Sequence, residues 1–451
     1  MAYIIQNGGS GYSRADFVSA IDGKQDVLVS EQNIKTINGQ SVLGSGNIEV
    51  SAREYDFGLS QLESSLKDAV VAKFTNSETG LNKEHKYVMF GVISDMHQCV
   101  TVNDRYGSVY ADAIPSLRLL GAIAQELSLD AVICSGDIVD GHDSMEYRRK
   151  TLAYVQSKFE QYIPCPYFIT DGNHERFYNN DGFSNSEWDT ICRGFNNKMG
   201  RNNIEITYLN DEIKKPNSDY KYKDGTTLGD GESSNAYCID FNDKKVRIGI
   251  LSPFDNGTWV FHGLSMWGLM KFDGREKKAD EWVLGICNHS YRAEGNGSYK
   301  NAQLRLLSLY TVPRDDLSGS GVWNKTYSKP NGETKGKASF GFIGGHKHHT
   351  EAIELTSNTG FQSTEVLVTR AHLMTSECNT PIDHSHNTGN SVTSYGFSLF
   401  VVNTDECKLY EVCVGRDERL DGTCPGTGYC IDDVTEGVTI YKYNMALPSQ
   451  S

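Results

Sequence analysis

The chain has 451 residues and a formal net charge of -15 at pH 7. This length allows two or three domains with a sizeable core, and the acidic balance argues against a nucleic-acid backbone as the main partner. No apolar run reaches the roughly 18 residues that could span a membrane, and the first residues lack the basic and apolar regions of a secretory signal. The 11 cysteines are scattered without a CxxC pair, which indicates reduced thiols rather than a disulfide framework.

Residues 1–52 differ from the rest of the chain and predict an attachment segment. Short alternating β segments over residues 24–48 are broken by Asn-Gly and Gly-Ser-Gly turns. Their apolar residues are too few for an independent core, so we expect partner chains to cover them. The stretch from Lys24 to Ile48 resembles the short repeat of phage tail-fibre and baseplate-associated proteins. That resemblance implies synthesis in the host cytoplasm, assembly into a virion with other phage tail proteins, and a homo-oligomer such as a trimer.

Apolar residues recurring every three to four positions predict a helix over residues 53–76. We assign residues 53–84 as a helical connector. The alternative is that this helix is the first element of the following domain.

Residues 85–418 alternate strand and helix patterns and predict an α/β domain. The predicted strands are 87–93, 131–134, 167–170, 246–251, 282–286, 340–343, 366–369, 398–402 and 409–414. The predicted helices are 115–127, 146–162, 187–199 and 303–310. Residues 180–245 are polar and rich in turn residues, which predicts an insertion over the site. Residues 419–451 are expected to form a Gly-rich tail with one β-like patch at 438–443.

Polar side chains capable of binding metal follow five of these predicted strands. They are Asp95 and His97, Asp137 and Asp140, Asn173 and His174, His289, and His346 and His348. In open α/β sheets, sites form outside the carboxyl ends of the strands, so we expect these residues at one edge. Oxygen and imidazole ligands without thiolate suit divalent ions of borderline hardness, such as manganese, iron or zinc. A carboxylate such as Asp137 could bridge two of them, an arrangement that serves phosphoryl displacement.

These five blocks resemble the signature blocks of the calcineurin-like metallophosphoesterases, in the family's order, over roughly residues 86–418. The resemblance implies an α/β fold of two packed mixed β-sheets flanked by helices, a four-layer sandwich. It implies a phosphoric ester hydrolase with two divalent metal ions. One ion would be held by Asp95, His97, Asp137 and His348, and the other by Asp137, Asn173, His289 and His346.

The same resemblance places His174 beside the leaving oxygen, as a general acid or as a stabiliser of the phosphoryl oxygens. Asp140 would orient a histidine by contacting its ring without binding an ion itself. The alternative is that Asp140 caps the following helix. Arg176, directly after the third block, is a candidate phosphate contact, with a surface arginine as the alternative. Asp171 departs from the small or apolar residue expected before that block, and a turn role would explain it.

Three functions are compatible with the sequence. The first is a phosphoesterase carried on a phage tail that cleaves a phosphodiester or phosphomonoester of a host-surface polymer, such as a teichoic-acid-like glycan. The second is a structural or receptor-binding tail protein that uses the same fold as a scaffold. The third is a phage nuclease, which the acidic charge and the lack of a basic stripe disfavour.

Overall fold

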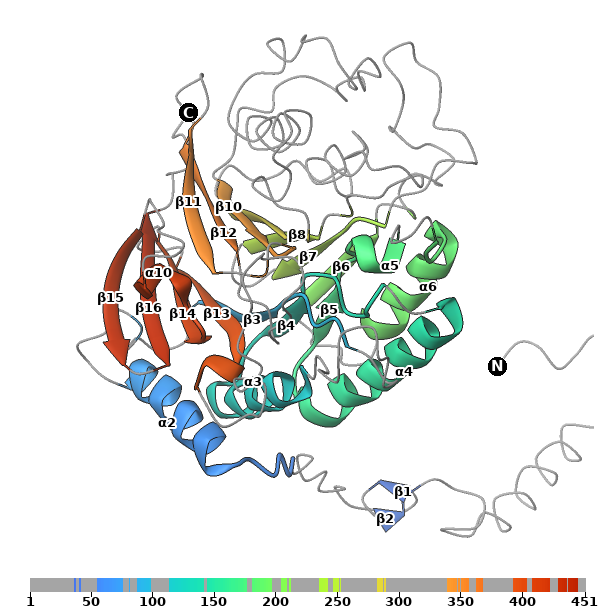
Figure 1. Ribbon diagram of the computed structural model, residues 1–451, viewed down its shortest axis with the longest axis horizontal. Helices are drawn as coiled ribbons and strands as arrows, with labels where there is room; N and C mark the ends of the chain where they lie inside the picture. The colour runs from blue at the N-terminus through green and yellow to red at the C-terminus, as the bar shows by residue number, and fades with distance from the viewer. Residues whose placement is uncertain are drawn as a thin grey trace, which may run out of the picture. The chain divides into compact units, whose positions relative to one another are not determined.

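The computed structural model, drawn in Figure 1, describes a defined set of segments of the chain. They are residues 36–37, 40–41, 55–75, 81, 87–98, 113–141, 144–176, 181–196, 204–208, 211, 235–241, 246–250, 252, 282–286, 288, 339–346, 348, 350–356, 362–367, 392–403, 408–421, 429–435 and 437–444. The chain divides into two compact units, Met1–Asp56 and Phe57–Ser451.

The first unit contains one described hairpin. Strands β1 (Thr36–Ile37) and β2 (Gln40–Ser41) pair antiparallel, with Thr36 opposite Ser41. They flank residues 38–39, an Asn-Gly pair of the kind favoured in tight two-residue hairpins. The β segments predicted on either side of this turn are therefore present.

The second unit contains two seven-stranded sheets. In the first sheet the order is β15-β16-β14-β13-β3-β4-β5. The strands β3, β4 and β5 run parallel, and all other pairings in this sheet are antiparallel. The strands are β3 (Val88–Ile93), β4 (Ala131–Cys134), β5 (Tyr167–Ile169), β13 (Gly396–Asn403), β14 (Lys408–Gly415), β15 (Tyr429–Thr435) and β16 (Val438–Asn444).

The second sheet has the order β11-β12-β10-β9-β8-β7-β6. Its centre, from β12 through β8, is parallel, and the outer pairings are antiparallel. The strands are β6 (Ile204–Tyr208), β7 (Tyr237–Phe241), β8 (Val246–Ile250), β9 (Trp282–Ile286), β10 (Ser339–Gly344), β11 (Glu351–Thr356) and β12 (Gln362–Leu367).

The described helices are α2 (Gln61–Thr75), α3 (Ile114–Leu127), α4 (Met145–Tyr162), α5 (Asn173–Arg176), α6 (Asn185–Asn196) and α10 (Glu418–Asp421), with a 3-10 turn at Val392–Ser394. One core lies between the first sheet and helices α2, α3, α4 and α6, and a second core joins the inner faces of the two sheets. The long helices lie along one side of the first sheet in Figure 1. The predicted fold of two packed mixed sheets flanked by helices is confirmed.

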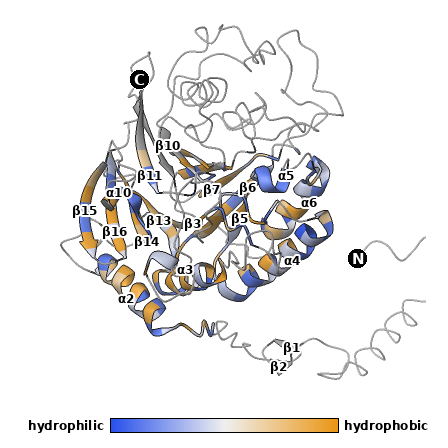
Figure 2. Ribbon diagram, viewed as in Figure 1, coloured by the Kyte–Doolittle hydropathy of each residue, from blue (hydrophilic) through white to orange (hydrophobic). Residues whose placement is uncertain are grey.

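Strand β3 shows why its sequence is apolar throughout. Val88, Phe90 and Val92 pack between the sheets, whereas Met89 and Ile93 pack under the helices. A strand buried on both faces needs a continuous apolar run. Figure 2 shows that the central strands are hydrophobic, whereas α4 at the surface is largely hydrophilic.

Helix α2 belongs to the second compact unit, which differs from its assignment as a connector. Its start is a capping box, because Ser60 Oγ accepts the Glu63 N–H and Glu63 Oε2 accepts the Ser60 N–H. Glu63 also pairs with Arg118 of α3 at 2.6 Å. Its buried face, which includes Leu66 and Val70, lies in the helix-side core. These contacts fit the alternative, a first helix of the following domain.

Two other boundaries differ from the sequence-based prediction. The segment 180–245 contributes β6 and β7 to the second sheet, and every β7 residue is buried. The tail contributes β15 and β16, which extend the first sheet beyond residue 418. Strand β16 is buried on both faces, because Ile440 packs toward the helices and Tyr441 between the sheets. The insertion and the tail are thus partly integral to the fold.

The predicted helix 303–310 lies outside the described residues. Among the helices that the structure describes, none is long and apolar enough to cross a membrane.

Candidate metal centre

The loops after β3 and β4 lie side by side and carry the first two predicted blocks. Past the strand ends the parallel pairing continues, because Asp95 N–H donates to the Gly136 carbonyl at 3.0 Å and His97 N–H donates to the Asp137 carbonyl at 2.9 Å. The backbone therefore fixes the spacing of Asp95, His97 and Asp137 before any ligand binds.

Five candidate ligands have left-handed backbone conformations. Their φ angles are 51° at Asp95, 41° at His97, 49° at Asp137, 71° at His346 and 58° at His348. Non-glycine residues rarely adopt φ > 0, and each such residue costs about 1–3 kcal/mol unless its surroundings impose it. In the described part of the chain, the one other non-glycine residue of this kind is at a helix end. Backbone strain is therefore concentrated at the predicted metal ligands.

Glycines in these blocks allow close approach of the loops. A Cβ on Gly172 would lie 2.1 Å from Asp137 Oδ1, and one on Gly345 would lie 2.1 Å from Asp95 Oδ2 and 2.0 Å from Ser94 Oγ. Gly172 and Gly345, each directly before a candidate ligand, are thus required by the carboxylate of a neighbouring loop.

Substitution of Gly345 by alanine is expected to displace Asp95 and to abolish binding of at least one metal ion, because the new methyl group occupies the carboxylate's position. Metal content per chain, measured by inductively coupled plasma mass spectrometry, tests this. The control is Gly194→Ala in α6, where a Cβ meets nothing within 4 Å. That change should leave metal content unchanged and stabilise the helix by about 0.5–1 kcal/mol. Normal metal content in Gly345→Ala would contradict the prediction.

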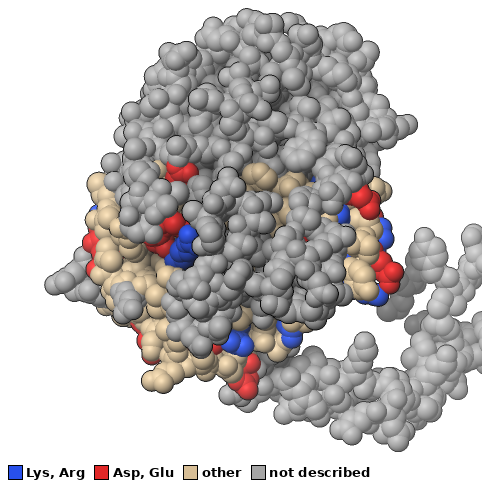
Figure 3. Space-filling view, in the orientation of Figure 1, with Lys and Arg blue, Asp and Glu red and all other residues tan. Residues whose placement is uncertain are grey.

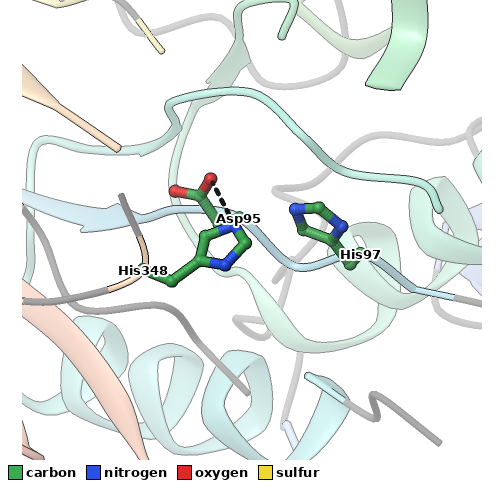
Figure 4. Close-up of side chains that lie close together, drawn as sticks. All are labelled: Asp95, His97 and His348. Carbon is green, nitrogen blue, oxygen red and sulfur yellow. Dashed lines mark ion pairs between the residues drawn. The ribbon is translucent and has the colours of Figure 1, made fainter. Parts of the chain in front are cut away.

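Asp95, His97 and His348 form a group whose ligand atoms all lie within 4.8 Å of one another. All three side chains are buried, and His348 Nε2 is 3.6 Å from Asp95 Oδ1. Figure 4 shows the His348 ring facing the Asp95 carboxylate, with His97 beside them. These residues come from the ends of β3 and β10, which belong to different sheets. The structure thus brings together three of the four ligands predicted for the first ion.

Asp137 lies between the two predicted ion sites. Its Oδ2 atom is 3.8 Å from His97 Nε2 and also 3.8 Å from His346 Nδ1. Its Oδ1 atom instead accepts the His174 N–H at 2.9 Å. One oxygen is therefore committed to the protein, while the other is placed between a histidine of each predicted ligand set. This is the position expected of a bridging carboxylate.

Two buried asparagines supply polar atoms without a protein partner. Among the residues that the structure describes, Asn173 Oδ1 has no hydrogen-bond partner, and neither do Oδ1 and Nδ2 of Asn288, which is fully buried. Leaving such a group unsatisfied costs about 1–3 kcal/mol, which a bound ligand would offset. Together with the imidazole and carboxylate donors, the Asn173 oxygen fits a centre for divalent ions of borderline hardness.

His174 is buried beside the group, with its ring centroid 4.1 Å from that of His97. Its Nδ1 atom accepts the Gly141 N–H at 2.9 Å, so the neutral ring carries its proton on Nε2. Asp140 Oδ1 lies 3.8 Å from the same Nδ1 atom. Helix α4 begins at Met145 with Ser144 as its N-cap, so Asp140 is not the capping residue. The ligand atoms of His97, Asp140 and His174 form a second close group.

Glu175 has a role that the sequence did not reveal. Its carboxylate accepts four backbone N–H groups, from Gly172 in its own loop and from Asp137, Ile138 and Val139 in the neighbouring loop, at 2.7–3.0 Å. Burial and then the charge of Asp137 raise the pKa of Glu175 to about 8, whereas the amide donors favour the ionised form. Glu175 therefore holds the second and third blocks together.

Arg176 is buried, so it is not a surface arginine. Its Nη1 atom is 3.0 Å from Asp171 Oδ2, and its Nη2 atom donates to Asn185 Oδ1. Asp171 is fully buried and ion-paired, which is more than a turn role. Burial raises the pKa of Asp171, and Arg176 opposes that shift. The proposed phosphate contact of Arg176 stays a prediction.

His289 lies outside the described residues. Its neighbour Asn288 is at the centre, because the Asn288 carbonyl accepts the Gly345 N–H at 3.0 Å and its Cβ lies 2.8 Å from where a Gly136 Cβ would be. Besides Glu175, Asn288 is the residue at this site that sequence reasoning missed. Its position directly before a predicted ligand was the available signal.

Part of the chain is similar to a known protein family. Residues 88–279 match the family model described as calcineurin-like phosphoesterase. A dimetal phosphatase from Danio rerio is among similar solved structures, with 14% identity and a TM-score of 0.43, covering 72% of this chain and 96% of that one. A search of curated proteins found no match. The matched range includes the first three blocks, and the structure adds His346 and His348 from β10 and the loop after it. Residues 88–279 are therefore similar to the calcineurin-like phosphoesterase family.

Proposed function

We propose that this protein hydrolyses a phosphodiester or phosphomonoester with two divalent ions and an activated water. The observation that carries the proposal is the Asp137 Oδ2 atom, 3.8 Å from a histidine of each predicted ligand set. Asp95, His97, Asp137 and His348 would hold one ion, and Asp137, Asn173, His289 and His346 the other. When bound, two such ions supply a nucleophile near neutral pH and offset the charge of an in-line displacement.

The protein's own residues would divide the remaining work. Glu175 keeps the two ligand loops in register through its four amide contacts. His174 presents an Nε2–H donor, since Gly141 occupies its Nδ1 atom. In the neutral ring this donor would stabilise a phosphoryl or leaving oxygen. Proton transfer to the leaving oxygen would instead require a second proton on Nδ1, and with it the loss of the Gly141 contact.

We further propose that the enzyme is carried on a phage tail and acts on a phosphorylated polymer of the host surface. The fibre-like segment supports this, and its β1–β2 hairpin matches the expected local structure. The net charge of -15 disfavours a polyanionic nucleic acid as the substrate. On the face drawn in Figure 3, acidic and basic side chains of the described residues are intermixed rather than gathered into a basic stripe.

The first experiment measures metal content and turnover of nitrophenyl phosphate and bis-nitrophenyl phosphate with manganese. We expect about two ions per chain in wild type and in His174→Ala, with turnover reduced about 10²–10⁴-fold in the variant. Preference between the two esters would identify the substrate class. Two ions without turnover in wild type would support the scaffold alternative, and cleavage of DNA in a gel assay would support the nuclease.

A second variant separates the two roles of His174. His174→Gln retains a side-chain N–H donor but cannot transfer a proton. If His174 is a stabiliser, this variant should retain more turnover than His174→Ala on every ester. If it is a general acid, both variants should lose far more on phenyl phosphate, a poor leaving group, than on nitrophenyl phosphate.

A further inference from the structure

Opposite charges bracket the short segment that carries Asn173 and His174. Asp171 precedes the segment and Arg176 ends it, and their side chains are each only 1% exposed. The 3.0 Å contact between Arg176 Nη1 and Asp171 Oδ2 closes residues 171–176 into a loop. Within this closed loop, the His174 ring lies 4.1 Å from that of His97, the Glu175 carboxylate accepts N–H groups of the neighbouring loop, and Asn173 Oδ1 is buried.

The same pair joins three elements of the fold. Ser252, two residues beyond β8, donates from its Oγ to Asp171 Oδ2 at 2.8 Å. Arg176 Nη2 donates to Asn185, the first residue of α6. Since β5 belongs to the first sheet and β8 to the second, the ion pair connects both sheets directly behind the third block.

A buried ion pair is weak evidence for stability, because desolvation of two charges offsets their attraction. An apolar pair of similar size would serve stability equally well. What the charged pair adds is directionality, since a guanidinium and a carboxylate meet in few geometries. Here the directionality fixes the separation of the two ends of the segment.

We propose that Asp171 and Arg176 are positioning residues of the metal centre. Their ion pair holds the backbone of residues 172–175 so that Asn173 Oδ1 and His174 reach the ligands supplied by the other loops. This inference rests on the proposed function, because it requires that Asn173 binds an ion. It accounts for the departure of Asp171 from the family pattern and for the burial of Arg176.

The test compares Asp171→Asn, Arg176→Gln, Arg176→Lys and the double variant Asp171→Asn/Arg176→Gln with wild type. Mn²⁺ binding is measured by isothermal titration calorimetry, together with melting temperature and the kcat and KM for bis-nitrophenyl phosphate. We expect Asp171→Asn and Arg176→Gln to bind the weaker ion about 10–100-fold less tightly. Their kcat should fall, and their KM should stay near the wild-type value. Arg176→Lys, which keeps the charge, should recover part of both. The double variant should lose less than the sum of the single changes, because neither charge is left alone.

The matched control is another buried Asp–Arg pair, between Asp240 of β7 and Arg247 of β8. Asp240→Asn should lower the melting temperature without changing Mn²⁺ affinity. If Asp171→Asn behaves in the same way, or binds Mn²⁺ as wild type does, the inference is overturned. If Asp171→Asn does not fold, Arg176→Lys is compared with Asp240→Asn instead. An Arg176→Lys variant that binds Mn²⁺ as wild type does would then overturn the inference. Failure of wild type to bind Mn²⁺ would instead overturn the proposed function, and the inference with it.

Discussion

Asp137→Asn is expected to remove at least one of two metal ions and to lower turnover by about 10³-fold. Asparagine keeps the size of the side chain and can still accept the His174 N–H through its oxygen. Its amide nitrogen would then occupy the position of Oδ2, 3.8 Å from His97 Nε2 and His346 Nδ1. An amide NH₂ cannot bind a cation, so the bridge is lost. Charge stabilisation by metal is worth several kcal/mol, and about 4 kcal/mol corresponds to 10³-fold.

Metal content and kcat/KM for the nitrophenyl esters test this expectation. The control is Asp130→Asn, a carboxylate at the opposite end of β3 whose Oδ2 accepts the Met89 N–H at 2.9 Å. Asp130 lies directly before β4, whereas Asp137 follows that strand at its other end, so metal content should stay at the wild-type value. An Asp137→Asn variant with two ions and turnover within tenfold of wild type would exclude the bridging role.

At a pH above the Glu175 pKa of about 8, Glu175→Gln is expected to lower the free energy of unfolding by about 3 kcal/mol and to weaken metal binding. Each carboxylate oxygen accepts two backbone N–H groups. Glutamine replaces one oxygen with a donor, so two buried N–H groups lose their acceptor, at a cost of about 1–3 kcal/mol each. Two of the four donors belong to Asp137 and Gly172, so the ligand loops should also shift apart.

Urea unfolding together with metal content measures both effects. Glu187→Gln serves as the control, because Glu187 pairs with Arg149 at the surface and such pairs contribute about 0–1 kcal/mol. A Glu175→Gln protein as stable as wild type would show that the amide contacts are dispensable.

Strands buried on both faces could be located from the sequence alone. The predictions 131–134 and 282–286 coincide with β4 and β9, because both are short apolar runs bounded by polar residues. Strand β7 escaped prediction because it contains Asp240, whose buried charge is compensated by Arg247 on β8. Strand β15 escaped because a register shift between Ile431 and Asp433 breaks the alternation of apolar and polar residues.

The ligand types and their order could likewise be assigned from sequence, since the chemistry of a metal centre limits which residues serve it. Their assembly could not. His346 N–H donates to Asp95 Oδ1 across 251 positions of the chain, and that contact joins the loop after β10 of the second sheet to the loop after β3 of the first. No local pattern encodes such a pairing.

The sequence by itself therefore determined the α/β class, most of the inner strands and the residues able to bind metal, because burial and ligand chemistry constrain residue type locally. Only the tertiary structure decided how the loops are held. Glu175 takes its partners from residues 36–38 positions away, and Asp171 is joined to Ser252 across 81 positions. A buried carboxylate looks the same in sequence whichever donors surround it, and those donors are supplied by the packing of strands that are distant along the chain.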